Sequence, residues 1–109
     1  MEFKARIKLW LENEKGYVFG EGTFKLLEKI QELGTLIGAS EELAMSYRQA
    51  WGMIKQTELR IGRPLLKTRK GGPLGGGGAE LTAEARLLME KYLEIKKNLK
   101  RTNETLDFI

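Results

Sequence analysis

The 109-residue chain contains no cysteine and no histidine. These absences exclude disulfides, thiolate zinc sites and any catalysis that needs a histidine base or a cysteine nucleophile. A carboxylate-based enzyme remains possible in principle, but no apolar pocket pattern surrounds a carboxylate pair. We therefore expect no enzyme, and we expect no bound cofactor or metal.

Long apolar runs are also missing, and none approaches the roughly 20 residues that cross a membrane. The N-terminal residues 1–4 lack the apolar stretch of a signal peptide. Hydrophobic residues make up 41% of the chain and charged residues 31%, which is typical of a folded, soluble protein. We expect one domain over residues 1–109, located in the cytoplasm and without membrane contact.

Charge is distributed unevenly, although the net charge is only +4. Residues 48–70 carry seven basic side chains and one acidic side chain, a local balance of +6. Residues 1–47 carry six basic and eight acidic side chains, a balance of −2. A basic segment on a near-neutral body favours binding to a polyanion, although an ordinary solvated surface would have the same composition.

The N-terminal part of the chain alternates apolar and polar residues. Apolar side chains stand at every second position from Phe3 to Leu11, which predicts a strand with one buried face. Trp10 falls on the polar side of this strand. A turn at residues 13–16 then allows residues 17–19 to pair back as a short second strand.

Three short helices are predicted next. Phe24, Leu27 and Ile30 have helical spacing, and Gly34 is placed to end that helix. Thr35 can cap a second short helix that stops near residues 44–45. Ser46 caps the third helix, and with a glutamine three residues on it fits the capping box.

The third helix is expected to bury one side and expose the other. The predicted buried stripe is Tyr47, Ala50, Trp51 and Ile54. The opposite side carries Arg48, Gln49, Gly52, Lys55 and Gln56. Gly62 and Pro64 end the helix and turn the chain.

A glycine tract over residues 71–78 separates two short extended runs, 65–70 and 79–82. This pattern predicts a β-hairpin with a glycine-rich tip, because glycine lets a backbone lie close to a phosphate or enter a groove. A nucleotide-binding P-loop would need a Lys-Ser or Lys-Thr pair after its last glycine. Ala79 and Glu80 follow instead, which argues against that site.

A long last helix is predicted to begin at Thr82 and to cover residues 82–106. Its apolar residues step by three and four, which is the spacing of a helix that packs on a partner helix. We expect a homodimer, while folding back onto the chain's own core is the alternative. The candidate dimerisation residues are Trp10, Leu88, Tyr92, Ile95 and Leu99.

The order of helix, helix, basic helix and basic hairpin predicts a mainly α (α+β) winged helix-turn-helix that binds duplex DNA. The N-terminal end of the third helix is expected to enter the major groove, and the hairpin, or wing, to contact phosphates or the minor groove. The candidate DNA-binding residues are Ser46, Tyr47, Arg48, Gln49, Lys55, Lys67, Arg69, Lys70, Gly75, Gly76 and Gly77.

Three other interpretations remain open. The third helix could be an ordinary core helix with a basic outer face. The protein could be an adaptor whose helical stripe recruits a separate effector-sensing subunit. Binding of structured RNA is a third alternative, although the clustered exposed aromatics of single-strand RNA readers are not evident.

The motif Ser46-Tyr47-Arg48-Gln49-Ala50-Trp51, together with the glycine tract and residues 79–82, resembles the N-terminal domain of the ModE family. These are molybdate-responsive bacterial and archaeal transcription regulators, and their DNA-binding part is similar to the LysR-type winged helix with a linker helix. The resemblance covers about residues 20–100. It implies a homodimer that regulates transcription at a palindromic DNA site, with the third helix as the recognition element.

The sequence departs from the family pattern at three places. Ala44 occupies a turn position often filled by glycine, so it is expected to adopt a left-handed conformation. The wing is one residue longer, and Pro73-Leu74 replaces a lysine. The chain ends at Ile109, so we expect a DNA-binding domain standing alone, without the molybdate-binding domains and without molybdate sensing.

Overall fold

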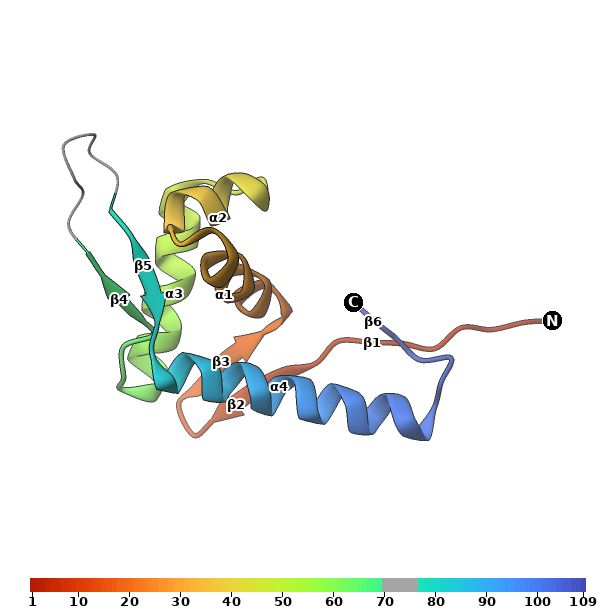
Figure 1. Ribbon diagram of the computed structural model, residues 1–109. Coiled ribbons are helices and arrows are strands. Elements are labelled where there is room, and N and C mark those ends of the chain that lie inside the picture. Colours follow the sequence, from red (N-terminus) through yellow and green to blue (C-terminus); the bar gives the residue numbers. More distant parts are fainter. Residues whose placement is uncertain (70–76) are drawn as a thin grey trace.

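The computed structural model describes residues 1–69 and 77–109. Three helices, α1 (Glu21–Leu33), α2 (Leu36–Glu42) and α3 (Tyr47–Ile61), form a head from which the long helix α4 (Ala83–Thr102) extends (Figure 1). The molecule measures 60 × 31 × 20 Å along its principal axes. Among the described residues, no helix is both long and apolar enough to cross a membrane.

Within residues 1–69 and 77–109, six short strands form three separate pairs. Two pairs are antiparallel: β2 (Trp10–Asn13) with β3 (Gly16–Gly20), and β4 (Leu66–Thr68) with β5 (Ala79–Leu81). The third pair joins the two ends of the chain in parallel, β1 (Arg6–Ile7) with β6 (Asp107–Phe108). The β4–β5 hairpin, the predicted wing, projects from the head beside α3 (Figure 1).

The prediction of one continuous strand from Phe3 to Leu11 is wrong. The segment divides into β1 and β2, which pair with different partners. Phe3 remains 85% exposed, because no part of the described chain covers this end of the segment. The predicted pairing of residues 17–19 with the preceding strand is confirmed.

The predicted N-caps and the predicted glycine end of the first helix are confirmed, although the hydrogen bonds of the described residues show only the Ser46 half of the capping box. Each N-cap hydroxyl accepts a hydrogen bond from the backbone N–H three residues on: Thr35 from Gly38 at 3.0 Å, Ser46 from Gln49 at 3.0 Å and Thr82 from Ala85 at 3.2 Å. Gly34 ends α1 in the left-handed conformation, with a φ of 75°. Such caps satisfy N–H and C=O groups that have no partner within the helix.

Ala44 forms the turn between α2 and α3 in the expected left-handed conformation. Its φ is 54°, and it is the only non-glycine residue with a positive φ in the described ranges. The N–H of the next residue, Met45, donates to the Ser40 carbonyl at 3.0 Å. The tight turn sets the angle at which α3 leaves α2.

An aromatic cluster joins α4 to the head. The Tyr92 ring lies 5.5 Å from both the Phe19 ring and the Phe24 ring, measured between centroids. Tyr92 is only 1% exposed, so it belongs to the core of its own chain. Its predicted place on the dimerisation surface is therefore wrong, because the head covers this part of the helix.

A polar contact also stabilises the junction between α4 and the head. The Tyr92 hydroxyl lies 2.8 Å from Glu21 Oε2, and Lys96 Nζ lies 2.9 Å from the same oxygen. Burial alone would raise the pKa of the Glu21 carboxyl, but the hydrogen bonds from Lys96 and Tyr92 and the nearby positive charges outweigh it. The pKa of Glu21 therefore lies below its ordinary value, whereas burial and the Glu21 carboxylate raise the pKa of Tyr92.

The predicted continuation of the last helix to Leu106 is also wrong. α4 ends at Thr102, and the chain turns back so that β6 can pair with β1. Leu106 is buried after this turn rather than in helical register with Leu99.

We expect Ala44→Gly to raise the free energy of unfolding by about 1 kcal/mol, because glycine removes the steric cost of the left-handed conformation. Urea denaturation measures the change. Ala83→Gly is the control: this exposed alanine is already helical, so the substitution should lower stability. A loss of stability in Ala44→Gly would contradict the account of the turn.

We also expect an acid-sensitive contribution from Glu21. Because its pKa is lower in the folded state, its contribution is complete above the ordinary value of 4.5 and disappears as the pH falls through the folded pKa. Glu21→Gln should lower the free energy of unfolding by about 1 kcal/mol at pH 7 and flatten its decline below pH 4.5. Parallel pH profiles for the two proteins would be inconsistent with this contact.

Candidate nucleic-acid interface

One face of α3 holds the helix in the head. Ala50, Ile54 and Thr57 are buried, and the Thr57 hydroxyl donates a hydrogen bond to the Val18 carbonyl at 2.8 Å. This contact ties α3 to strand β3. The opposite face of α3 is therefore turned to solvent.

The side chains predicted for that outward face are exposed as expected. They are Arg48, Gln49, Gly52, Lys55 and Gln56, and Ser46 is exposed at the N-cap. A β-carbon added at Gly52 would meet no atom within 4 Å. The outward face of α3 is thus open to a partner along its N-terminal half.

Tyr47 and Trp51 were predicted to be buried, and this prediction is wrong. They are 50% and 39% exposed, and their rings stack at 6.4 Å between centroids and 13° between planes. Lys55 Nζ lies 4.4 Å from the centroid of the Trp51 ring, which places a cation over its face. The buried stripe of α3 runs through Thr57 instead, so the aromatic pair lies beside it on the side of the hairpin.

The hairpin is fixed to α3 through Leu65, which is fully buried. The backbone N–H of Leu65 donates to Glu58 Oε2 of α3 at 2.7 Å. Its carbonyl accepts from the N–H of Thr82, the N-cap of α4, at 2.9 Å. A third bond joins the N–H of Ala79 in β5 to the carbonyl of Gly34 at 2.8 Å. These bonds set the position of the hairpin relative to α3, the end of α1 and the start of α4.

A groove of about 250 Å³ lies between α3 and the hairpin. Its lining is largely apolar and comes from α2, α3 and both arms of the hairpin. The side chains that project from its walls are Ile37, Tyr47, Trp51, Leu66, Thr68 and Arg69. This groove could not be predicted from the sequence, because the two aromatic residues fit a helical core stripe equally well.

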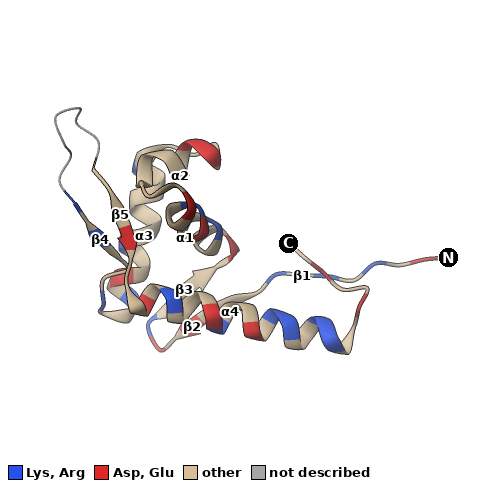
Figure 2. Ribbon diagram, viewed as in Figure 1, with Lys and Arg blue, Asp and Glu red and all other residues tan. Residues whose placement is uncertain are grey.

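Basic side chains are exposed on the two elements that form the groove, and one of them, Arg69, lines it. Arg48 and Lys55 are exposed on α3, and Lys67 and Arg69 are exposed on or next to β4. Figure 2 shows basic residues on the β4 arm of the hairpin and an acidic residue on β5. That acidic residue is Glu80, which pairs directly with Lys67 in the strand register. On α3, Lys55 forms an ion pair, with its Nζ 3.0 Å from Glu58 Oε1.

The two arms of the hairpin lie close together at Arg69 and Gly78. The Arg69 N–H donates to the Gly78 carbonyl at 2.9 Å, one residue beyond β4. A β-carbon added at Gly78 would lie 2.7 Å from Arg69 Nη2, so glycine leaves room for the guanidinium. Gly77 is exposed at the end of this arm. The predicted contact residues Lys70, Gly75 and Gly76 lie outside the described residues.

Arg60, which contributes to the basic segment of the sequence, faces another part of the molecule. Its guanidinium donates to the Lys15 carbonyl, and its own carbonyl accepts from Asn13 Nδ2 at 2.9 Å. Asn13 ends β2, and Lys15 lies in the turn between β2 and β3. The positive charge of residues 48–70 is therefore divided between two surfaces.

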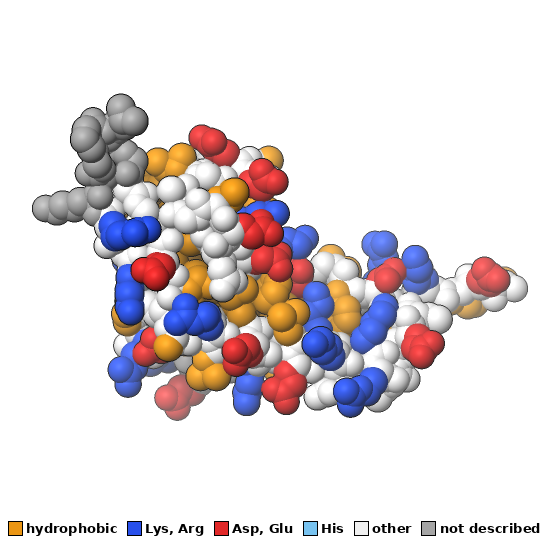
Figure 3. All heavy atoms as spheres, in the orientation of Figure 1, with side chains coloured by type: hydrophobic (Ala, Val, Ile, Leu, Met, Phe, Trp, Pro, Cys, Tyr) orange, Lys and Arg blue, Asp and Glu red, His pale blue; other side chains and the backbone are white. Residues whose placement is uncertain are grey.

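The predicted dimerisation residues also differ in how exposed their side chains are. Trp10 is exposed, whereas Leu88, Ile95 and Leu99 are only half-buried in the chain itself. Two leucines of α4 that the heptad stripe leaves out, Leu87 and Leu93, are 63% and 40% exposed. Figure 3 shows hydrophobic side chains gathered between the head helices and α4.

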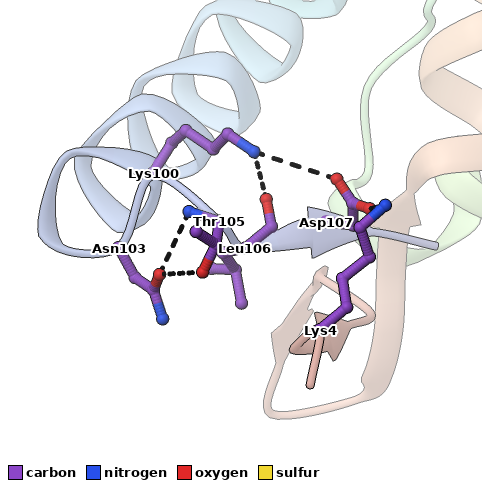
Figure 4. A network of polar contacts seen from close by, with 6 residues as sticks. All are labelled: Lys4, Lys100, Asn103, Thr105, Leu106 and Asp107. Carbon is purple, nitrogen blue, oxygen red and sulfur yellow. Dashed lines mark hydrogen bonds and ion pairs between the residues drawn. The ribbon is translucent and has the colours of Figure 1, made fainter. Parts of the chain in front are cut away.

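The two chain termini pair with each other near the C-terminal end of α4. Lys4 Nζ lies 3.0 Å from Asp107 Oδ2 and so joins the two terminal segments, and Lys100 of α4 donates to the carbonyl of Leu106 just before β6 (Figure 4). The hydrogen bond from Lys4 and its charge, together with the charge of Lys100, hold the pKa of the Asp107 carboxyl below its ordinary value. In residues 1–69 and 77–109, no group of carboxylates is placed to hold a metal ion.

No protein-family model matches the chain. Curated relatives do match. Among them are the transcriptional regulator ModE of Haemophilus influenzae, 36% identical over 80 residues, and the molybdenum transport protein ModE of Azotobacter vinelandii, 29% identical over 109 residues. These matches cover 73% and 96% of this chain. The chain spans only 29% and 39% of the length of these relatives.

Solved structures with a similar fold are LysR-type DNA-binding domains. The DNA-binding domain of CbnR, in a complex with DNA, has a TM-score of 0.56 and 22% identity, covering 76% of this chain and 88% of that one. Full-length LysG from Corynebacterium glutamicum has a TM-score of 0.54 and 21% identity, covering 75% of this chain and 26% of that one. The fold is thus the winged helix-turn-helix, and the chain is homologous to the N-terminal region of the ModE transcriptional regulators.

Proposed function

We propose that this protein binds duplex DNA and regulates transcription. Its relative ModE of Haemophilus influenzae is named as a transcriptional regulator. The observation that carries the proposal is the placement of α3 and the β4–β5 hairpin. Hydrogen bonds through Leu65 hold them next to each other, with exposed cations on both. A helix and a basic hairpin in this arrangement suit the two adjacent grooves of a duplex.

Each element has a role in the proposed complex. The N-terminal half of α3 enters the major groove, where Arg48 can donate two hydrogen bonds to a guanine edge. Gln49 can pair with adenine, because only its backbone N–H is used by the Ser46 cap. Lys55 lies further along the helix, near the phosphates. On the hairpin, Lys67 and Arg69 neutralise phosphates while Gly77 allows a close approach.

The proposed unit is a homodimer in which α4 is the principal dimerisation element of the single domain. Support comes from Leu87 and Leu93, which are exposed although large apolar side chains favour burial. A two-fold symmetric protein should prefer a two-fold symmetric DNA site, with half-sites about one helical turn or a multiple apart. The proposal is one of binding without catalysis, and it places the protein in the cytoplasm with the DNA.

The same exposed leucines also support the alternative of an adaptor that holds a separate effector-sensing subunit. The two functions differ in what the isolated chain does. An adaptor has no need to bind DNA by itself, whereas the proposed regulator binds it with the surface described above.

Fluorescence anisotropy of labelled duplexes tests the proposed function directly. We expect binding to a random-sequence duplex at low salt, with the logarithm of the binding constant falling linearly as the logarithm of salt concentration rises, because phosphate contacts release counterions. A symmetric site selected from a random pool should bind more tightly. Absence of binding at low salt would favour the adaptor.

Arg48→Ala should weaken binding to the selected site by about 1–3 kcal/mol and relax the base preference at one position of each half-site. Arg101→Ala, at the end of α4, removes the same charge far from the proposed interface and should leave site preference unchanged. If Arg48→Ala weakens every sequence equally, Arg48 contacts only phosphate.

Leu87→Glu should weaken dimerisation at least about tenfold, because it places a charge in the proposed apolar contact. Sedimentation equilibrium measures the effect. Leu33→Glu is the control, since Leu33 is an exposed leucine at the end of α1 rather than on α4. Equal dimerisation of the Leu87→Glu variant and the original protein would remove α4 from the interface.

A further inference from the structure

The groove between α3 and the hairpin combines two features that seldom occur together on a surface. Its α3 wall is a stacked pair of exposed aromatic rings, Tyr47 and Trp51, continued by the exposed Ile37 of α2. Its hairpin wall carries the exposed cation Arg69 and the small residues Gly77 and Gly78. An exposed apolar patch of this kind marks a binding surface more often than it marks a stable solvated face.

We propose that this groove seats one sugar–phosphate strand of the duplex, with deoxyribose packed against the Tyr47 and Trp51 rings. The inference rests on the proposed function and specifies how the surface holds DNA between its two reading elements. The aromatic wall contacts sugars, which every nucleotide has. It therefore contributes affinity to all sequences.

The geometry of a duplex requires a strand at this place. The major groove is about 12 Å wide and admits α3, and the narrower minor groove, about 6 Å wide, lies beside it. The two grooves are separated by one sugar–phosphate strand. If α3 occupies one groove and the hairpin lies at the next, that strand passes through the space between them, which is the groove of about 250 Å³.

The chemistry of the two walls fits the two parts of such a strand. A deoxyribose ring presents C–H groups, which pack favourably on an aromatic face, whereas its phosphate oxygens need cations or N–H donors. The Arg69 guanidinium supplies a donor on the hairpin side. On the α3 side, Lys55 lies 4.4 Å from the Trp51 ring centroid and limits its rotation, so the aromatic wall is ordered before DNA arrives.

The charge placement argues against a protein segment as the occupant. The charged residue of the groove lining is the cation Arg69, and Lys55 lies against the Trp51 ring of the α3 wall. Lys55 forms an ion pair with Glu58. The groove lining itself contains no acidic residue among those described. A polyanion with an apolar component matches this surface better than a neutral helix would.

Trp51 fluorescence reports directly on the groove. In a Trp10→Phe variant, Trp51 is the only tryptophan of the chain. We expect saturating duplex to reduce the acrylamide quenching constant of Trp51 at least about threefold, at the same DNA concentration at which anisotropy saturates. Unchanged quenching on a saturated complex would overturn the inference and leave the proposed function standing. If no duplex binds at all, the proposed function itself fails.

The salt dependence of DNA binding distinguishes the contribution of the aromatic wall from that of the cationic hairpin wall. Trp51→Ala should weaken binding about tenfold for every duplex without changing the slope of log K against log salt, because no charge is lost. Arg69→Ala should lower the magnitude of that slope by about 0.9. Trp51→Phe should retain most of the affinity, and Leu59→Ala, an exposed apolar residue of α3 outside the groove, should have no effect.

Two further outcomes would contradict the sugar contact. If replacing thymine by uracil in the DNA weakens the original protein but not Trp51→Ala, the aromatic wall contacts thymine methyl groups instead. If hydroxyl-radical protection of deoxyribose is the same with the original protein and with Trp51→Ala, no sugar lies against Trp51. Circular dichroism of Trp51→Ala confirms that the variant is folded, and the quenching experiment needs no such variant.

Discussion

The position of Leu65 determines the shape of the proposed DNA-binding surface. This residue is fully buried, and both of its backbone polar groups are bonded: the N–H donates to Glu58 of α3 in the head, and the C=O accepts from the N–H of Thr82, where β5 leads into α4. A buried backbone group without a partner costs several kcal/mol in apolar surroundings, at most about 7 kcal/mol, so any other placement of this residue is disfavoured. As a result, the hairpin cannot change its angle to α3 without breaking bonds inside the core. Two short elements with little contact area of their own become a rigid pair.

The long helix depends on a second junction. Tyr92 packs on Phe19 and Phe24 and reaches Glu21 with its hydroxyl, so the middle of α4 is bound to α1 and β3. The half of α4 beyond Tyr92 projects from the head and is supported by the pairing of the two termini (Figure 1). This arrangement fixes the direction of α4 relative to the DNA-binding face. In a dimer through α4, that direction would set the spacing of the two heads.

The local features of the fold follow from the sequence, and the long-range ones do not. Caps such as Ser46 and Thr82 and the left-handed turn at Ala44 depend on a few neighbouring residues, so their chemistry is visible in the sequence. The orientation of α3 about its axis is different. Tyr47, Ala50, Trp51 and Ile54 share a helical face almost as well as Ala50, Ile54 and Thr57 do, because the two stripes overlap by half.

What selects the second stripe is a contact far away in the sequence, the Thr57 hydrogen bond to Val18. The parallel pairing of β1 with β6 could not be predicted from the sequence either, since it joins residues about 100 positions apart. In the candidate site, the outward cations of α3 were predictable from their spacing. The aromatic wall of the groove was not, because large aromatic side chains at helical spacing are usually buried.

Backbone amide shifts of the isotope-labelled protein on addition of duplex DNA test the central claim most directly. The account predicts shifts concentrated in residues 46–56, 66–69 and 77–79, the two sides of the groove, with little change in the β2–β3 turn. Shifts confined to α4 and the paired termini, or spread evenly over the chain, would contradict it.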